Sequence, residues 1–354
     1  MTTTFGIEEE FMLLDPATLA PVETAQQAIA ALDDGRQDGT VAAEFLRSQV
    51  EYATPVCTTM SDAVDALIGF RRRLDRWATD AGVVAAGTGT PLSGRPLSAV
   101  SEGERYAEIA SEVTSLTNDH QICGLHVHVG VDRDLGVRAS NALRGWLPVL
   151  LALSGNSPFW SGRDTGYDSW RAIHSRRWTT YGIPPVFRDT DDYDRTVAAL
   201  IGIGATTDAR ALNWNVRLST VYPTIEVRVC DVQLDAASSV TLAIVIRALV
   251  DAAHDDSTLP HGREPWDAAL WHAARHGTGD TLVHPGTGGL ASASEVLDAL
   301  IERVTPHLRG GEEVRAATAM LERPRTGATL QRAAREHGIP ALAELYRQWL
   351  VRLP

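Results

Sequence analysis

Apolar and polar residues alternate along four segments of the chain, and the two-residue period of this alternation predicts β-strands. The segments cover residues 5–13, 123–131, 212–219 and 224–230. Glu8 and Glu10 share one face of the first segment, and His126 and His128 lie between glycines on one face of the second. The other face carries mainly apolar side chains. The pattern therefore predicts a sheet with one apolar face and one polar face.

The last two segments add amide and charged groups to the polar face. Glu226 and Arg228 alternate with aliphatic residues, and Asn213, Asn215 and Arg217 alternate with Trp, Val and Leu just before them. Acidic residues are depleted from strands, so their regular placement favours a functional role. A cross-strand ion pair without chemistry is the alternative for the Glu–Arg pair, and two hydrogen-bonded core histidines are the alternative for the His pair.

Helical periodicity is clearest over residues 61–82, where Ser61 is the expected N-cap and Gly82 the expected end. The arginine run 71–73 within this helix is expected to face solvent. Other helices are predicted at residues 23–33, 101–116, 134–153, 192–203 and 236–251, and from 265 onward with breaks near 277–291, 310 and 323–327.

Residues 41–53 carry two further carboxylates, Glu44 and Glu51. Their spacing cannot bring both to one face of a flat strand, so they reach a common site only if a bulge or bend lies between them. A solvated surface position is the alternative for each.

Three connecting segments have recognisable patterns. Residues 101–104 have capping-box spacing and open a helix. Residues 87–91 form a Gly-Thr-Gly-Thr-Pro loop that could approach a phosphate, although a plain turn is the preferred interpretation. Residues 162–191, rich in Trp, Tyr, Arg and Pro, are predicted to form a loop that faces the substrate.

The chain has 354 residues, 44% of them hydrophobic, and can bury a large core. We predict a single domain over residues 1–354, with the sheet and its helices in about 1–255 and a helical part in about 264–354. A domain boundary near residues 256–264 is the alternative.

Charge and cysteine content narrow the functional classes. A net charge of -13 argues against nucleic acid or an anionic membrane as partner. No apolar run reaches the length of a bilayer span, and the N-terminus lacks the pattern of a signal peptide. Cys57, Cys123 and Cys230 are too few and too scattered for a disulfide framework or a Cys-rich zinc site, and Cys230 is expected to be a core thiol. These features predict a soluble, cytoplasmic protein.

All 32 basic residues are arginine, because the chain contains no lysine. A phosphate-binding loop of the Gly-Lys-Ser/Thr type and a lysine Schiff base are therefore excluded. Any anion must be held by arginine, by a metal ion or by backbone amides.

The polar face of the predicted sheet requires a compensating cation. Two carboxylates about 5 Å apart repel each other by roughly 3 kcal/mol at an effective dielectric constant near 20. Carboxylate oxygens suit a hard cation that also binds phosphate, so Mg²⁺ is the best candidate.

Four groups of residues carry a resemblance to a known family. They are Gly6-Ile7-Glu8-Glu9-Glu10-Phe11, Cys123-Gly124-Leu125-His126-Val127-His128-Val129-Gly130, Asn156-Ser157-Pro158-Phe159-Trp160 with Asp164-Thr165-Gly166, and Glu226-Val227-Arg228-Val229-Cys230-Asp231. In this order, over roughly residues 4–275, the chain resembles the carboxylate–amine ligase family, the type 2 glutamate–cysteine ligase-like proteins related to glutamine synthetase.

The resemblance implies an α+β fold in which a curved antiparallel sheet of the glutamine synthetase-like type, backed by helices, surrounds an ATP site. Carried over by position, the implied metal ligands are Glu8, Glu10, Glu44, Glu51, His128 and Glu226. The implied catalytic residues are Arg228, Glu226 and Glu51, and Arg228 and His126 would contact the nucleotide. One departure is the segment 213–217, which lacks the acidic residue that the family pattern leads us to expect.

The implied reaction joins a carboxylate to an amine after ATP converts the acid to an acyl phosphate, with Mg²⁺ as cofactor. Glutamate and cysteine are the default substrates, and the sequence leaves the oligomeric state open, a homo-oligomer included. Two rivals are a metal-dependent amidohydrolase, which would require zinc and not ATP, and a non-catalytic nucleotide or small-molecule binding protein.

Overall fold

The structure is a computed structural model that describes residues 3–33, 35, 38–94, 99–254, 265–322 and 326–353. Its largest sheet has seven strands in the order β2-β3-β1-β5-β9-β8, with β4 paired to the end of β1. The strands are β1 (Phe5–Leu14), β2 (Thr40–Ala43), β3 (Gln49–Ala53), β4 (Val84–Ala86), β5 (Gly124–Gly130), β8 (Val216–Leu218) and β9 (Thr224–Asp231). Every strand pair in it is antiparallel, which confirms the predicted α+β class.

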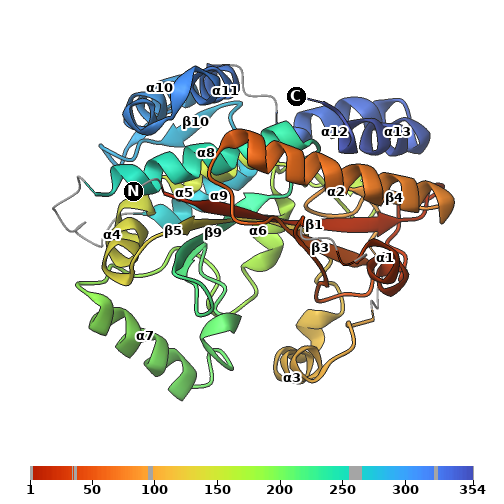
Figure 1. Cartoon of the computed structure of the whole chain (residues 1–354), viewed down its shortest axis with the longest axis horizontal. Coiled ribbons are helices and arrows are strands. Elements are labelled where there is room, and N and C mark those ends of the chain that lie inside the picture. Colours follow the sequence, from red (N-terminus) through yellow and green to blue (C-terminus); the bar gives the residue numbers. More distant parts are fainter. Residues whose placement is uncertain are drawn as a thin grey trace.

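The apolar face of the sheet packs against four helices. These are α2 (Met60–Asp80), α4 (Arg133–Leu143), α5 (Leu147–Ser154) and α8 (Ala236–Ala252). Figure 1 shows α2 and α8 running along the same side of the sheet. Alternate residues of β1, β5 and β9 enter this core, because successive side chains of a strand point to opposite faces.

A buried ion pair crosses this apolar layer. Glu9 lies on the core face of β1, and Arg71 of α2 binds its carboxylate with two hydrogen bonds of 2.9 and 2.6 Å. Both side chains are fully buried. The expectation that the whole arginine run faces solvent is therefore wrong for Arg71, although Arg72 is exposed. The run spans three successive helical positions, so its members point in different directions.

The boundaries of three predicted helices differ in the structure. Thr59, not Ser61, caps α2 and forms a capping box with Asp62, because the helix begins at Met60. The predicted capping box at residues 101–104 is wrong, since α3 (Glu104–Val113) begins after Gly103 without a side-chain cap. The helix predicted over residues 134–153 is two helices, α4 and α5, and Pro148 lies in the first turn of the second.

Two groups of shorter elements complete the chain. Figure 1 shows α3, α6 (Trp170–Ser175) and α7 (Thr190–Gly202) on the polar side of the sheet. The short strands β6 (Phe159–Trp160) and β7 (Arg163–Asp164) pair with each other, and α1 (Ala25–Leu32) contacts α2, β2 and β3. The C-terminal part comprises α9 (Trp266–His276), β10 (Thr281–Val283), β11 (Leu290–Ser292), α10 (Ala293–Val304), α11 (Gly310–Glu322), α12 (Gly327–Glu336) and α13 (Ile339–Leu350).

The C-terminal part packs against the rest of the chain at several places. Helices α10 and α11 contact α8, and α13 contacts β4 and α2. The hairpin β10–β11 falls in a predicted break between helices, where three-residue strands leave too short an alternation to recognise. The boundary considered at residues 256–264 lies outside the described residues. No helix in the described ranges is long and apolar enough to cross a membrane.

Candidate active site

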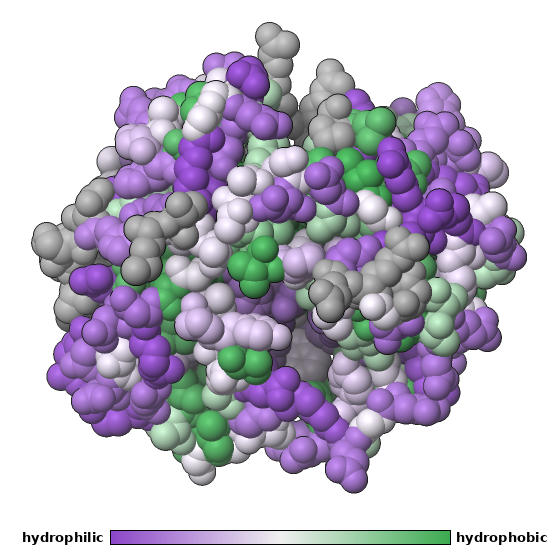
Figure 2. All heavy atoms as spheres, in the orientation of Figure 1, coloured by the Kyte–Doolittle hydropathy of each residue, from purple (hydrophilic) through white to green (hydrophobic). Residues whose placement is uncertain are grey.

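The polar face of the sheet forms the floor of a cavity of about 1480 Å³. Figure 2 shows a hollow below the centre of the surface in the same orientation as Figure 1. All the site residues that we predicted from the sequence line this cavity. They are Glu8, Glu10, Glu44, Glu51, His126, His128, Glu226 and Arg228.

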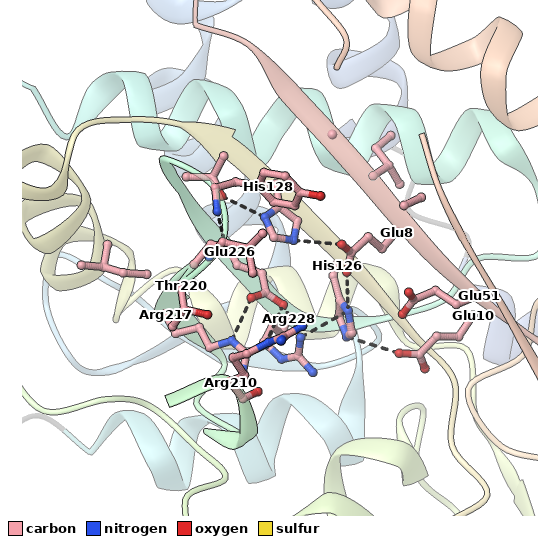
Figure 3. Close-up of a pocket in the computed structure, with 18 of the residues that line it drawn as sticks. Glu8, Glu10, Glu51, His126, His128, Arg210, Arg217, Thr220, Glu226 and Arg228 are labelled. Carbon is pink, nitrogen blue, oxygen red and sulfur yellow. Dashed lines mark hydrogen bonds and ion pairs between the residues drawn. The ribbon is translucent and has the colours of Figure 1, made fainter. Parts of the chain in front are cut away.

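Strand register explains why these side chains converge. Across β1 and β3 Glu10 pairs with Glu51, and across β1 and β5 Glu8 pairs with His126. His128 pairs in turn with Glu226 of β9. Residues directly opposite each other in antiparallel strands point to the same face, so neighbouring strands contribute one continuous polar row, seen in Figure 3.

Glu44 reaches the same site through a bend in the chain. Strands β2 and β3 form an antiparallel pair in which Ala42 lies opposite Glu51, and Glu44 follows directly after β2. The hydroxyl of Ser101 donates a hydrogen bond to the carbonyl of Glu44 and ties this bend to the segment before α3. A bend between Glu44 and Glu51, as their spacing required, is therefore present.

Glu10, Glu44 and Glu51 form an acidic end of the cavity. Each carboxylate offers an oxygen within 4.8 Å of the others. Burial and the charge of Glu44 raise the pKa of Glu10 to about 8. Burial, then the charges of Glu44 and Glu8, raise the pKa of Glu51 well above its usual range, and burial likewise raises the pKa of Glu44. Three crowded carboxylates with raised pKa values are the expected signature of a site built for a cation.

Glu8 lies in the middle of the row, between the two histidines. Its carboxylate oxygens are 3.4 Å from Nδ1 of His126 and 3.2 Å from Nε2 of His128, and Nδ1 of His128 is 2.9 Å from the Thr224 hydroxyl. Burial alone would raise the pKa of Glu8, but the hydrogen bonds with both histidines lower it below the usual range. Burial and the charge of Arg228 lower the pKa of His126 to about 4.

Glu226 and two arginines form the basic end of the cavity. Arg217 binds the carboxylate of Glu226 at 2.8 and 3.3 Å, and Arg228 binds it as well. Arg228 also lies 3.4 Å from Nδ1 of His126. Burial alone would raise the pKa of Glu226, but the charges of Arg228 and Arg217 lower it well below the usual range. Glu226 is therefore a carboxylate whose charge is already compensated.

Three sets of donors in the described residues have the geometry to hold a metal ion. They are Glu10 with Glu44 and Glu51, Glu8 with Glu51 and His126, and Glu8 with His128 and Glu226. The all-carboxylate set fits a hard cation best, because its oxygens are crowded and poorly compensated. The set that contains Glu226 shares its carboxylate with two guanidinium groups. These sets support the predicted ligands, whose role stays a prediction.

A β-bulge in β9 decides which side chains face the cavity. Leu125 pairs with Cys230, but Val127 pairs with Val227, so Arg228 and Val229 together lie opposite one residue of β5. The extra residue reverses the alternation beyond it. Cys230 consequently enters the hydrophobic core, as expected for a core thiol, whereas simple alternation would have placed it beside Arg228.

Two arginines of the site were not among the nominated residues. Arg217 belonged to the segment that departs from the family pattern, yet it binds Glu226. Arg171 of α6 lies in the predicted substrate-facing segment and lines the cavity, as do Trp178 and Tyr181 of the same segment. The sequence signal for Arg171 is Gly124, the glycine before the His-x-His motif. A Cβ at Gly124 would lie 2.4 Å from Nη2 of Arg171, so only glycine leaves room for the guanidinium.

The Gly-Thr-Gly-Thr-Pro loop at residues 87–91 lies elsewhere. It is buried and absent from the lining of the cavity. A Cβ on Gly87 would lie 2.3 Å from the carbonyl oxygen of Gln233. Its glycines therefore allow close backbone packing, which agrees with the preferred interpretation as a structural turn.

Comparison with solved structures supports the fold. A glutamate–cysteine ligase from Francisella tularensis in complex with AMP superimposes with a TM-score of 0.72 at 14% identity, over 100% of this chain and 90% of that one. A bifunctional glutathione synthetase from Pasteurella multocida gives a TM-score of 0.72 at 16% identity, over 98% of this chain and 52% of that one. The predicted ligase-type fold is thereby confirmed.

Comparison of sequences gives the family. A protein of Saccharopolyspora erythraea named "Putative glutamate--cysteine ligase 2-2" is 42% identical over 95% of this chain and 89% of its own length. A "Putative glutamate--cysteine ligase 2-1" of Rhodococcus jostii is 39% identical over 93% of this chain and 90% of its own. The family model described as Glutamate-cysteine ligase family 2 (GCS2) matches residues 4–347 of this chain. The chain belongs to glutamate–cysteine ligase family 2, a family of carboxylate–amine ligases.

Proposed function

We propose that the protein is an ATP-dependent ligase that joins a small carboxylic acid to an amine through an acyl phosphate. The observation that carries this proposal is the convergence of an acidic end and a basic end in one cavity, on the face where the family motifs lie. The names of the relatives make glutamate and cysteine the first acid and amine to test. The AMP complex of the Francisella protein supports a nucleotide as co-substrate.

The reaction balances without a covalent enzyme intermediate. An oxygen of the acid attacks the γ-phosphorus of ATP and ADP leaves. The nitrogen of the amine then attacks the acyl carbon, loses a proton, and inorganic phosphate leaves. Mg²⁺ would neutralise charge on the phosphates when bound. Glu10, Glu44 and Glu51 would hold one such ion, and Glu8, His128 and Glu226 would hold another.

Arg228 is the residue best placed to stabilise charge on the transferred phosphoryl group. It lies in the cavity between Glu226 and His126, as Figure 3 shows. Glu226 accepts a hydrogen bond from Nη1 of Arg228 and so restrains that end of the guanidinium. Arg217 also binds Glu226. Arg217 is itself held by hydrogen bonds that it donates to the carbonyl groups of Arg210 and Leu212. The basic end is thus rigid before a substrate binds, which favours electrostatic preorganisation.

Replacement Arg228→Lys is expected to lower the rate of ADP formation by about 100-fold, because Nη1 of Arg228 already contacts Glu226 and His126, and an ammonium group has no second nitrogen to offer a phosphoryl group. The measurement is a steady-state coupled assay of ADP release. Arg138→Lys, at an exposed position of α4 outside the cavity, is the matched control and should be indistinguishable from wild type. A variant at position 228 with near wild-type turnover would rule out this role.

The test of the function is a screen for phosphate release with Mg-ATP and pairs of amino acids and amines, followed by mass measurement of the product. A new amide with stoichiometric ADP and phosphate is the expected result. Hydrolysis of an amide that requires zinc but no ATP would instead identify an amidohydrolase. Nucleotide binding without ADP release for any pair would identify a binding protein.

The C-terminal part is included in the proposed catalytic unit. We propose that residues 1–354 act as one unit, which the packing of α10 and α11 on α8, and of α13 on β4, supports.

A further inference from the structure

A buried polar cluster lies next to the cavity, on the same face of the sheet, away from the residues already assigned. Its centre is Asp231, the last residue of β9, which pairs with Gly124 and is fully buried. One of its carboxylate oxygens accepts hydrogen bonds from the backbone N–H of Asn156 at 2.9 Å and from the Ser157 hydroxyl at 2.6 Å. The other oxygen accepts a hydrogen bond from the Ser169 hydroxyl at 2.9 Å.

Asp231 faces this cluster because of the β-bulge in β9. Without the extra residue at positions 228 and 229, alternation along β9 would send Asp231 to the opposite face of the sheet. The bulge therefore puts Asp231 on the same face of the sheet as Arg228, which ordinary alternation already places in the cavity. The motif residues Asn156, Ser157 and Asp231, which the proposed reaction does not use, meet at this point.

Arg171 connects the cluster to the cavity. Its backbone N–H donates to the Ser157 hydroxyl at 3.0 Å, and its Nη1 lies 3.7 Å from Asp231. The two guanidinium Nη atoms also donate to the carbonyl oxygens of Arg228 and Val229, the two bulged residues, at 3.1 and 3.3 Å. The side chain of Arg171 is 7% exposed, and within the described residues its Nε has no hydrogen-bond partner.

The guanidinium of Arg171 lies beside the acidic end of the cavity. Gly124, over which it passes, donates its backbone N–H to Glu10 at 2.6 Å. The partners of the Arg171 guanidinium are two neutral carbonyl groups and the carboxylate of Asp231. That carboxylate already accepts three shorter hydrogen bonds. A buried arginine so incompletely paired retains donors and positive charge for an incoming anion.

Helix α12, in the C-terminal part, packs against the cluster and hydrogen-bonds to it. Gln331 is fully buried, and its amide donates to the side-chain oxygen of Asn156 at 2.6 Å and to the backbone carbonyl of the same residue at 2.9 Å. The side-chain carbonyl oxygen of Gln331 accepts a hydrogen bond of 2.8 Å from the Tyr346 hydroxyl of α13. The helix comes this close because Gly327 has no side chain, since a Cβ there would lie 1.8 Å from the amide oxygen of Asn156.

The Gly-Thr-Gly loop closes the remaining side of the cluster. A Cβ on Gly89 would lie 2.9 Å from both Asp231 and Ser157, and the hydroxyl of Thr88 is 3.3 Å from Gln331. Segments that are distant in sequence thus enclose Asp231 on all sides. Such a fully paired polar cluster fixes one arrangement of its members.

We propose that Arg171 is a receptor for an oxyanion of the substrates, and that Asp231, Ser157 and Asn156, anchored by Gln331, are positioning residues that hold it in the cavity floor. The inference rests on the proposed function, because it assumes that an acid and a phosphorylated nucleotide bind there. The oxyanion is either a carboxylate of the acid or the phosphoryl group.

The test is calorimetric titration of the full-length protein with Mg-ADP, and then with L-glutamate or with inorganic phosphate in the presence of Mg-ADP. Arg171→Ala should weaken one of these two oxyanions by at least about tenfold, since hydrogen bonds to charged groups contribute about 1.5–3 kcal/mol. Asp231→Asn should weaken the same oxyanion by about tenfold. The affinity for Mg-ADP should change by less than about twofold in both variants.

A double-mutant cycle separates positioning from general destabilisation. If Asp231 acts through Arg171, adding Asp231→Asn to Arg171→Ala should weaken the oxyanion by less than about twofold further. Ser169→Ala is a milder variant that removes one hydrogen bond to Asp231 should Asp231→Asn fail to fold. Gln331→Leu should also lower oxyanion affinity selectively, whereas Gln348→Leu, on the exposed surface of α13, should not.

The outcomes distinguish this inference from the proposed function. Selective loss of L-glutamate affinity identifies the carboxylate, and selective loss of phosphate affinity identifies the phosphoryl group. Additive effects in the cycle, equal losses of Mg-ADP affinity, or wild-type protein that binds neither oxyanion beside Mg-ADP would overturn the inference. Failure of wild-type protein to bind Mg-ADP at all would instead refute the proposed function.

Discussion

Replacement Glu10→Gln is expected to reduce Mg²⁺-dependent ADP formation by about 1000-fold, because a bound metal ion contributes several kcal/mol of charge stabilisation and each 1.36 kcal/mol is tenfold in rate. Glu10 is buried in the acidic end of the cavity with Glu44 and Glu51. The amide keeps the shape of the side chain and an oxygen that can accept the hydrogen bond from Gly124. It removes only the charge. Initial rates of ADP release at saturating Mg-ATP give the measurement.

The same variant should not be less stable than wild type. Burial and Glu44 raise the pKa of Glu10 to about 8, so folding near pH 7 must protonate a carboxylate that is ionised in the unfolded chain, a cost that the neutral amide does not have. The free energy of unfolding in urea should therefore stay equal or rise. Glu302→Gln, at an exposed position of α10, is the matched control and should leave both quantities unchanged. Turnover close to wild type in the Glu10 variant would contradict the metal-ligand role. A loss of stability together with a loss of rate would also contradict it, because the lower rate would then follow from the damaged fold and not from the missing charge.

Replacement Arg71→Leu is expected to lower the free energy of unfolding by about 3–5 kcal/mol, because it leaves Glu9 as an uncompensated charge in the core. Arg71 also donates hydrogen bonds to the carbonyl groups of Leu234 and Gln233, at 2.8 and 3.0 Å. Its loss therefore disconnects α2 both from β1 and from the segment that leads into α8. Equilibrium unfolding in urea measures the difference.

The neighbouring residue offers a stringent comparison. Arg72 has the same chemistry one position further along α2, but it is exposed, so Arg72→Leu should change the free energy of unfolding by no more than about 0.5 kcal/mol. Removing both partners with Glu9→Leu and Arg71→Leu should restore part of the loss, since no unpaired charge remains. Equal effects at positions 71 and 72 would show that the ion pair is not a determinant of stability.

The contrast between these two arginines shows what a one-dimensional pattern can and cannot predict. Periodicity located the polar face of the sheet, because a strand repeats every two residues whatever it packs against. It could not identify Arg71 as buried, since that depends on a carboxylate 62 residues away in the sequence. Glu9 was the available signal: a charged residue on an apolar strand face requires a partner.

The bulge in β9 marks a second limit. Alternation correctly placed Glu226 and Arg228 on one face, but it failed just beyond them, where Cys230 enters the core. A bulge adds one residue without leaving a signal in the hydrophobic pattern of so short a strand. Arg171 was missed for a related reason, since it lies in a segment whose path is set by tertiary contacts with Ser157 and Asp231.

Helix boundaries were predicted to within a few residues, but several caps were not. Thr59 and Ser61 are both good N-cap residues, and only the backbone conformation decides between them. The division between α4 and α5 follows from Pro148, which is tolerated in a first turn and not in a helix interior.

The contact between Gln331 and Asn156 also bears on how the protein is made. A chain leaves the ribosome from its N-terminus, and elements begin to fold as they emerge. Asn156 emerges 175 residues before Gln331, so this contact with the cluster around Asp231 forms only after the whole catalytic sheet has emerged. Nascent chains that have not yet reached Gln331 would thus contain Glu10, Glu44 and Glu51 but lack the contact that holds Asn156, and truncations that remove α12 should be planned with that in mind.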